Sequence, residues 1–237
     1  KNGFEKDVFQ RALAEKTKMF GYISAEYIKD MGTPDRYEKV SNDVISGRVS
    51  RLNSKNKRPA FFLDRDGVIN KEVNLLNSAE QIELIPGVSE AVKKINKAGY
   101  LAIVVTNQPV IARNLCGFDD LQHIHDKIET LLGKERAYLD AIYFCPHHPD
   151  KGYPEERAEY KIECTCRKPK PGMLLQAAED WNIDLSESYM IGDRDWDVQA
   201  GEAARVKKSV KIPENKDNAL LDVVVKLIEQ DKKNKIE

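Results

Sequence analysis

Residues 61–70 of this 237-residue chain read Phe-Phe-Leu-Asp-Arg-Asp-Gly-Val-Ile-Asn, and they decide its fold. An apolar run that leads into two carboxylates is typical of a buried central strand with acids at its C-terminal end. Because side chains alternate along a strand, Asp64 and Asp66 share a face. Two converging carboxylates repel each other and favour a bound cation, for which Mg²⁺ is suited. The alternative is structural: a helix-capping Asp followed by an Asp-Gly turn.

The rest of the chain alternates between strand and helix patterns. Further strands are predicted at residues 101–105, 141–145, 189–191 and 206–212, and helices at residues 88–98, 118–132, 172–181, 196–204 and 217–230. This alternation predicts an α/β fold with a doubly wound parallel (Rossmann-like) sheet. Only a loop and one helix fit between Asp66 and Thr106, so we expect an open site without a large cap domain.

Composition narrows the class of protein. Apolar residues make up 41% of the chain, enough for a buried core, and a net charge of −1 gives no general case for binding nucleic acid. No apolar run is long enough to span a membrane and no signal peptide is recognised, so no membrane partner is expected. The four cysteines are expected as reduced thiols or metal ligands, which places the chain in the cytoplasm.

Polar residues follow three of the predicted strands. Asp64 and Asp66 end the first strand, residues 106–108 (Thr-Asn-Gln) the second, and Asp193 a third. Because the C-terminal ends of parallel strands meet at one edge of a sheet, these groups should converge on one crevice. Each alone is typical of a cap or a turn, but their joint occurrence favours chemistry. Residues 167–168 (Arg-Lys) offer positive charge for a phosphate.

This set of groups predicts phosphoryl transfer. Asp64 would attack phosphorus in line and form an aspartyl phosphate. Asp66 would protonate the leaving alcohol and then accept a proton from water. Asp64, Asp193 and the backbone carbonyl of Asp66 would bind Mg²⁺. Thr106 and Lys168 would hold the oxygens of the transferring phosphoryl group.

Four segments closely resemble the motifs of haloacid-dehalogenase-type phosphatases: residues 64–70, 106–108, 166–169 and 192–197. Over about residues 59–212 the chain is most similar to the D-glycero-D-manno-heptose 1,7-bisphosphate 7-phosphatase branch, and next to the histidinol-phosphate phosphatases. The resemblance implies a Mg²⁺-dependent phosphatase that removes the C7 phosphate of a small sugar phosphate. Asn70 and residues 111–113 favour the heptose branch.

The resemblance also implies a set of substrate contacts. They are Glu72, Val73, Asn74, Leu75, Arg167 and Arg194, to which we add Asn107, Gln108 and Arg113. The Arg113 side chain is expected to reach a second anionic group. One departure concerns Pro109 and Val110, which replace a small residue and the Gly usual in this family. Because Pro109 cannot donate a backbone hydrogen bond, the substrate-side loop is expected to differ.

A second cluster of residue types predicts a structural Zn²⁺ site. Its members are Cys145, His147, Cys164 and Cys166. Three thiolates and one imidazole fill a tetrahedral shell, and the pattern falls where the resembled family carries zinc. The metal would pin the loop that bears Arg167 and Lys168. The alternative is unconnected reduced thiols. His148 is not expected to be a ligand, and Trp196 is expected to be a packing residue.

The N-terminal part looks helical and separate. Thr33 and Pro34 are typical of an N-cap and a first helical residue. Residues 27–37 resemble the C-terminal end of a sugar-phosphate nucleotidyltransferase, in which the residue matching Asp30 helps bind metal, but the Gly-rich signature of that family is absent. The resemblance implies the end of a fused enzyme; the alternative is a helical packing or dimerisation appendage. The chain is thus divided into a nucleotidyltransferase remnant at 1–46, a polar linker at 47–58, a phosphatase domain at 59–212, and a C-terminal helix and tail at 213–237.

Three functions remain open on this basis. The first is a heptose 1,7-bisphosphate 7-phosphatase. The second is a histidinol-phosphate phosphatase or another small sugar-phosphate phosphatase; a cationic substrate would favour acidic groups in place of Arg113. The third is a catalytically silent scaffold for a nucleotidyltransferase, against which the complete set of acids argues. The preferred anomer at C1 and the oligomeric state are not predicted.

Overall fold

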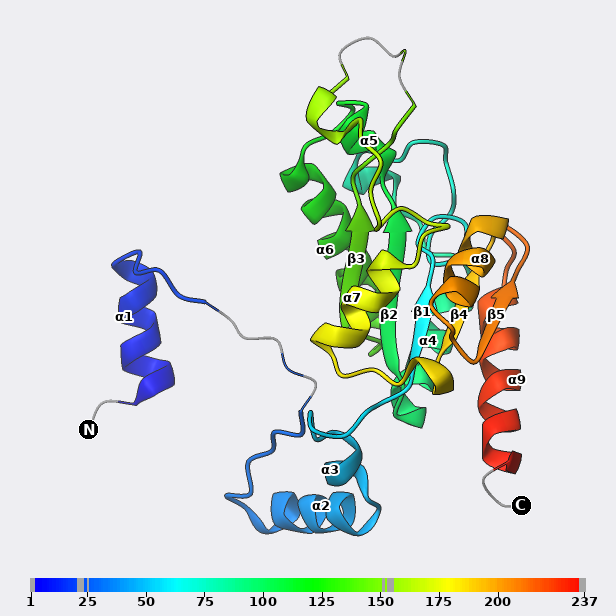
Figure 1. Cartoon of the computed structure of the whole chain (residues 1–237). Coiled ribbons are helices and arrows are strands. Elements are labelled where there is room, and N and C mark those ends of the chain that lie inside the picture. Colours follow the sequence, from blue (N-terminus) through cyan, green and yellow to red (C-terminus); the bar gives the residue numbers. More distant parts are fainter. Residues whose placement is uncertain (1–2, 21–23, 25, 151, 153–155, 235–237) are drawn as a thin grey trace.

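A parallel sheet forms the centre of the molecule (Figure 1). The computed structural model describes residues 3–20, 24, 26–150, 152 and 156–234. Five strands lie in the order β3-β2-β1-β4-β5, and every neighbouring pair is parallel. Their bounds are β1 Ala60–Leu63, β2 Leu101–Asn107, β3 Ala141–Cys145, β4 Tyr189–Gly192 and β5 Lys208–Lys211. The predicted doubly wound sheet is confirmed, with the strand that leads into the acids at its centre.

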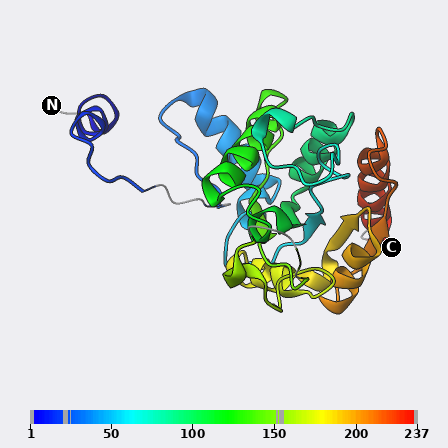
Figure 2. The same ribbon diagram turned by 90° about the horizontal axis from the view of Figure 1, so that it is seen from above.

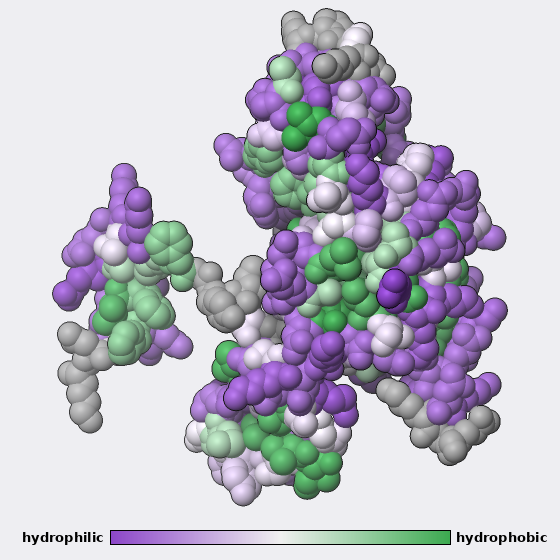
Figure 3. Space-filling view, viewed as in Figure 1, coloured by the Kyte–Doolittle hydropathy of each residue, from purple (hydrophilic) through white to green (hydrophobic). Residues whose placement is uncertain are grey.

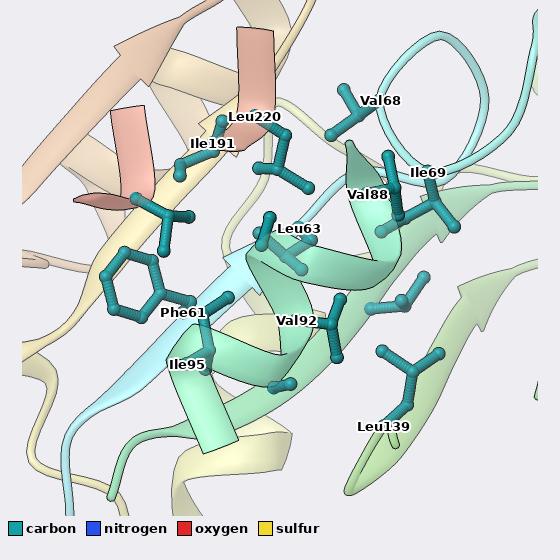
Figure 4. Packing of buried hydrophobic residues seen from close by; sticks show 14 of the residues in the cluster. Phe61, Leu63, Val68, Ile69, Val88, Val92, Ile95, Leu139, Ile191 and Leu220 are labelled. Atoms are coloured by element: carbon teal, nitrogen blue, oxygen red, sulfur yellow. The ribbon is translucent and has the colours of Figure 1, made fainter. Parts of the chain in front are cut away.

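One face of the sheet is covered by three helices: α4 Val88–Ala98, α6 Phe118–Lys134 and α9 Ala219–Asn234. Figure 4 shows how Val92 and Ile95 of α4 pack beside Phe61 and Leu63, the two β1 side chains that point to this face. All these side chains are fully buried. Because α9 contributes Leu220 and other buried residues to this core, it is part of the central domain.

The opposite face is covered by α7 Gly172–Asp180 and α8 Asp195–Ala203. Gly201 lets helix α8 approach the sheet closely. A Cβ atom at this position would lie only 2.6 Å from Cβ of Met190 on β4. Any larger residue at Gly201 would therefore push α8 away from the strand that precedes Asp193.

Short elements complete the domain: η2 Ala79–Gln81, α5 Pro109–Ala112, η3 Ala158–Tyr160 and η4 Leu185–Glu187. Between residues 66 and 100, all of which are described, η2 and α4 are the helical elements, so this segment holds no cap domain. Pro109 is the first residue of α5, where a missing backbone N–H costs nothing. The proline that replaces the family's usual small residue is thus accommodated as the start of a helical turn.

The N-terminal part holds η1 Phe4–Val8, α1 Phe9–Ala14, α2 Pro34–Ile45 and α3 Arg48–Arg51. Helix α2 begins at Pro34 with Thr33 as its N-cap, as predicted. Residues 47–58 are not irregular throughout, because α3 lies within them. The side chain of Asn182 donates a 3.0 Å hydrogen bond to the carbonyl of Ser54 and so ties this linker to the domain.

Helix α1 stands apart from the sheet in two perpendicular views (Figures 1 and 2). Neither α1 nor α2 buries a residue. Phe20 and Ile28 are 91% and 84% exposed, and Figure 3 shows apolar surface on both helical parts of this segment. Across the described residues, no helix has the length and apolar character needed to cross a membrane.

Candidate active site

Asp64 follows the last residue of β1 and lies at the carboxyl edge of the sheet. Its Oδ1 atom is 2.7 Å from Nζ of Lys168 and accepts a 2.7 Å hydrogen bond from the backbone N–H of Arg65. Burial raises the pKa of Asp64 to about 7; Lys168 acts against this rise, and neighbouring Asp197 adds to it. The carboxylate is thus buried, oriented and poor in compensating positive charge.

Asp66 is held by three neighbours. The Arg65 guanidinium donates to both of its oxygens, at 3.1 and 2.8 Å, and the amides of Asn70 and Gln108 donate at 2.9 Å each. Burial would raise the pKa of Asp66, but Arg65 and these hydrogen bonds outweigh it and lower the pKa. Arg65 itself is fully buried and contacts His125. Its role as a clamp was not predicted, although an Arg between two acids at a buried strand end is a signal.

Three carboxylates form a group that could hold a metal ion. Ligand oxygens of Asp64, Asp193 and Asp197 all lie within 4.8 Å of one another. Oδ1 of Asp193 is buried and lacks a hydrogen-bond partner among the described residues, and burial raises the pKa of this carboxyl. Hard oxygen ligands with surplus negative charge fit Mg²⁺. The side chain of Asp66 lies outside this group because Arg65 engages it, which leaves its backbone carbonyl as the expected ligand.

Lys168 and Asp197 form a buried pair that the sequence interpretation did not connect. Lys168 Nζ lies 2.7 Å from Oδ1 of Asp197 and donates a 2.8 Å hydrogen bond to the carbonyl of Val105. Asp197 also accepts from the backbone N–H of Arg194 at 2.9 Å, as a helix cap does. Capping is the role its position suggests, so its second role, to aim Lys168, was missed.

Thr106 and Asn107 end β2 beside these groups, and Gln108 follows as the N-cap of α5. Asn107 exchanges two hydrogen bonds with the backbone of Lys168, at 3.1 and 3.0 Å. Gln108 donates to Oγ1 of Thr106 at 2.8 Å as well as to Asp66. Both amides were predicted as substrate contacts. They line the pocket, but their side chains also hold Lys168 and Asp66 in place.

These groups surround one pocket of about 480 Å³. The predicted residues in its wall are Asp64, Asp66, Glu72, Asn74, Leu75, Thr106, Asn107, Gln108, Arg113, Arg167, Lys168, Asp193 and Arg194. Val73 is not among them and is 45% exposed, and its contact with substrate stays a prediction. Trp196 was expected to be a packing residue, but it is 46% exposed on the pocket wall beside Arg194. His148 and Glu214 also line the pocket.

The four predicted soft ligands lie together: Cys145, His147, Cys164 and Cys166. Five sulfur–sulfur and sulfur–nitrogen distances among them fall between 3.2 and 3.6 Å. Ligand atoms of a tetrahedral zinc with bonds of roughly 2.0–2.3 Å lie about 3.3–3.8 Å apart. All three cysteines are free thiols, and His148 is not in the group. The arrangement can therefore hold one tetrahedral metal ion directly before Arg167.

The chain is similar in sequence to known hydrolases. Residues 6–205 match the family model of the haloacid dehalogenase-like hydrolases. A protein of Pasteurella multocida named D-glycero-beta-D-manno-heptose-1,7-bisphosphate 7-phosphatase is 40% identical over 159 residues, which is 67% of this chain and 84% of that protein. A Burkholderia mallei relative named for the alpha anomer is also 40% identical, over 66% of this chain and 80% of its own length.

Two solved structures share the fold. The D,D-heptose 1,7-bisphosphate phosphatase of B. bronchiseptica, complexed with magnesium and phosphate, is 29% identical with a TM-score of 0.60, covering 73% of this chain and 99% of that one. A putative phosphatase of the same superfamily from Mesorhizobium loti is 30% identical with a TM-score of 0.65, covering 73% and 87%.

Proposed function

This chain belongs to the haloacid dehalogenase-like hydrolases, and we propose that it hydrolyses the C7 phosphate of a D-glycero-D-manno-heptose 1,7-bisphosphate. The observation that carries this proposal is the pocket. Asp64, Asp66 and Lys168 line it together with two further cationic side chains, Arg113 and Arg167. A substrate with two phosphates, one reacting and one bound, fits this surplus of cationic groups.

The reaction proceeds in two steps. In the first, a carboxylate oxygen of Asp64 attacks phosphorus and the bond to the C7 oxygen breaks. Asp66, which Arg65 keeps ionised in the free enzyme, would take up a proton when the substrate phosphate binds and pass it to that oxygen. In the second, Asp66 takes a proton from water, whose oxygen attacks phosphorus and releases inorganic phosphate and free Asp64. Lys168 stays beside Asp64 throughout and stabilises negative charge on the phosphoryl oxygens.

Asp64, Asp193 and the backbone carbonyl of Asp66 would hold Mg²⁺. The buried, unpartnered Oδ1 of Asp193 supports this assignment. When bound, the ion neutralises charge on the transferring phosphoryl group. Asp197 is better placed to orient Lys168, to which it is directly paired.

The substrate loop and the arginines would select the sugar. The Glu72 carboxylate and the Asn74 amide line the pocket and can bond to hydroxyl groups. Arg113 and Arg167 would bind the C1 phosphate, and Arg194, which pairs with Asp193 at 3.0 Å, lies on the side of the reacting phosphate.

A structural zinc would be bound by Cys145, His147, Cys164 and Cys166. Its position supports a role in placing the next two residues, because the backbone N–H of Arg167 contacts Sγ of Cys164 at 3.4 Å. Closure of this loop by a metal would fix Arg167 and Lys168 at the pocket. Free thiols placed where they could bind a metal ion also support a cytoplasmic place of action.

Residues 1–46 would be the end of a preceding sugar nucleotidyltransferase. The support is their exposed apolar side chains, Phe20 and Ile28 among them, together with the sequence around Asp30. Such surface is typical of a segment that packs on another domain. Purification of a longer chain with both activities would support this assignment.

The test is phosphate release from the α- and β-heptose 1,7-bisphosphates and from histidinol phosphate, with Mg²⁺ and with Mg²⁺ withheld. We expect Mg²⁺-dependent release of one phosphate from a heptose, with the C1 phosphate retained in the product. The faster anomer identifies the natural substrate. Turnover of histidinol phosphate alone would overturn the proposal, and Asp64→Asn serves as the inactive control.

A further inference from the structure

A loop outside all four motifs closes one side of the active site. This β5–α9 loop, residues 212–218, connects the edge strand to the last helix. Its Glu214 lines the pocket and lies 2.6 Å from Nη2 of Arg194. The next residue, Asn215, donates its backbone N–H to the carbonyl of Gly67 at 3.0 Å. The loop therefore contacts the turn that follows Asp66.

The side chain of Asn215 binds a second active-site segment. Its Oδ1 accepts the backbone N–H of Glu72 at 2.7 Å, and its Nδ2 donates to the carbonyl of the same residue at 3.4 Å. One amide thus engages both backbone groups of Glu72, a residue 143 positions earlier in the chain. Asn215 has a φ of 54°, in the left-handed region that Asn tolerates.

The segment that Asn215 holds needs such support. Asn74 and Leu75 both have left-handed backbones, with φ of 58° and 55°, a conformation that is unfavourable for leucine. Val73 between them and Glu72 is 45% exposed. A short, partly exposed loop with two left-handed residues keeps its shape only if its ends are fixed.

We propose that Asn215 is a positioning residue for the substrate loop, residues 72–75. By fixing the backbone of Glu72, it would hold the Glu72 and Asn74 side chains where the pocket receives the polyol part of a substrate. The identity of that polyol rests on the function proposed above, whereas the clamp itself does not. The hydrogen bonds of the Asn215 side chain go to the Glu72 backbone and not to a catalytic carboxylate, so the chemical step should not depend on this side chain.

The test variant is Asn215→Gly, which keeps the left-handed backbone and the hydrogen bond to Gly67 but removes the side-chain amide. Asn182→Gly is its matched control, because Asn182 also has a left-handed φ, 49°, and its side chain binds one backbone carbonyl far from the pocket. Asn215→Asp keeps the acceptor of the shorter bond and tests for rescue.

We expect Asn215→Gly to raise KM for the heptose bisphosphate about five- to tenfold, as loss of two hydrogen bonds predicts. Its kcat/KM for p-nitrophenyl phosphate, which has no polyol, should stay within about twofold of wild type. Amide hydrogen exchange at Glu72 should accelerate at least tenfold. Asn215→Asp should recover most of the affinity, and Asn182→Gly should change none of these quantities.

The outcomes separate the two proposals. An unchanged KM with unchanged exchange at Glu72, or equal losses with both substrates, would overturn the positioning role. If the wild-type enzyme releases no phosphate from either heptose bisphosphate, the proposed function fails. In that case the exchange rate at Glu72 in Asn215→Gly still decides whether the clamp exists.

Discussion

Buried carboxylates lie near both ends of strand β4. Asp231 lies at its start, and Asp64, Asp193 and Asp197 lie beyond its end. At its first residue, Tyr189 donates a 2.7 Å hydrogen bond to Asp231 of α9, which also accepts from Tyr100 and, at 2.9 Å, from Lys207. Burial raises the pKa of Asp231, but these donors outweigh it and lower the pKa. This carboxylate has a full set of partners and joins α9 to the sheet.

Beyond the last residue of β4, the buried carboxylates have too few cationic and hydrogen-bonding partners. Asp64 and Asp197 share a single ammonium group, Lys168, and Asp193 is paired through one oxygen with the half-exposed Arg194. Burial raises the pKa of both Asp64 and Asp193. The difference shows how to tell the two kinds of buried acid apart. A satisfied carboxylate stabilises the fold, whereas surplus buried negative charge marks a place where a cation and a phosphate bind.

The largest contrast is expected between Asp64→Asn and Asp231→Asn. The first should reduce phosphate release about 10⁴-fold or more, because an amide cannot attack phosphorus. It should leave the free energy of unfolding unchanged or higher, since it removes a poorly compensated charge. Asp231→Asn should keep its activity within about twofold. Phosphate assays and urea unfolding of both variants measure this contrast, and a stable, inactive Asp231→Asn would contradict it.

Binding of Mg²⁺ should raise the free energy of unfolding through the active-site carboxylates and not through Asp231. At about 100 times its Kd the ion should add about 2.7 kcal/mol to the free energy of unfolding of the wild type. Asp193→Asn should lose this increment, and Asp231→Asn should keep it. Thermal unfolding over a Mg²⁺ titration provides the measurement. An equal shift in all three proteins would place the ion elsewhere.

The features that the sequence predicted depend on the pattern of neighbouring residues. The apolar run before Asp64, the strand–helix alternation and the Thr33–Pro34 helix start each depend on neighbouring residues. The carboxyl edge of a parallel sheet then brings Asp64 and Asp193 together by topology alone. These features were predicted, and the structure places them as expected.

The features that the sequence did not predict depend on pairs of residues that are far apart in the chain. Asp197 lies where a helix cap is expected, so only three-dimensional contact shows that it orients Lys168. Asn215 and its partner Glu72 are 143 positions apart, and the partners Tyr100 and Asp231 are 131 apart. Single side chains such as these carry no periodic signal, and their roles arise only when the chain has folded.

The satisfied group should contribute measurably to stability. Asp231→Asn should lower the free energy of unfolding by about 2 kcal/mol, because hydrogen bonds to a buried charged group are replaced by weaker ones and the new amide faces Lys207. The matched control is Glu229→Gln on the exposed side of the same helix, which should change stability by less than about 0.5 kcal/mol. Urea unfolding gives both values, and equal effects would argue against a specific role for Asp231.

The smallest and most discriminating effect is the pH dependence of stability. The folded-state pKa of Asp231 lies below its ordinary value, so its contribution is full above that value and is lost as the pH falls through the folded pKa. The wild type and Asp231→Asn should therefore differ by a constant amount from pH 8 to 5 and converge below about pH 4.

In the absence of Mg²⁺, Asp64 should change the stability with pH in the opposite direction to Asp231. Because burial raises its pKa to about 7, its ionisation costs stability above that pH, and the cost disappears as the pH falls toward the unfolded-state value. The wild type should gain stability relative to Asp64→Asn between pH 8 and pH 4, whereas added Mg²⁺ should suppress the difference. Urea unfolding across this range measures both trends. If the two carboxylates titrate with the same sign, burial alone, rather than the balance of partners, governs them both.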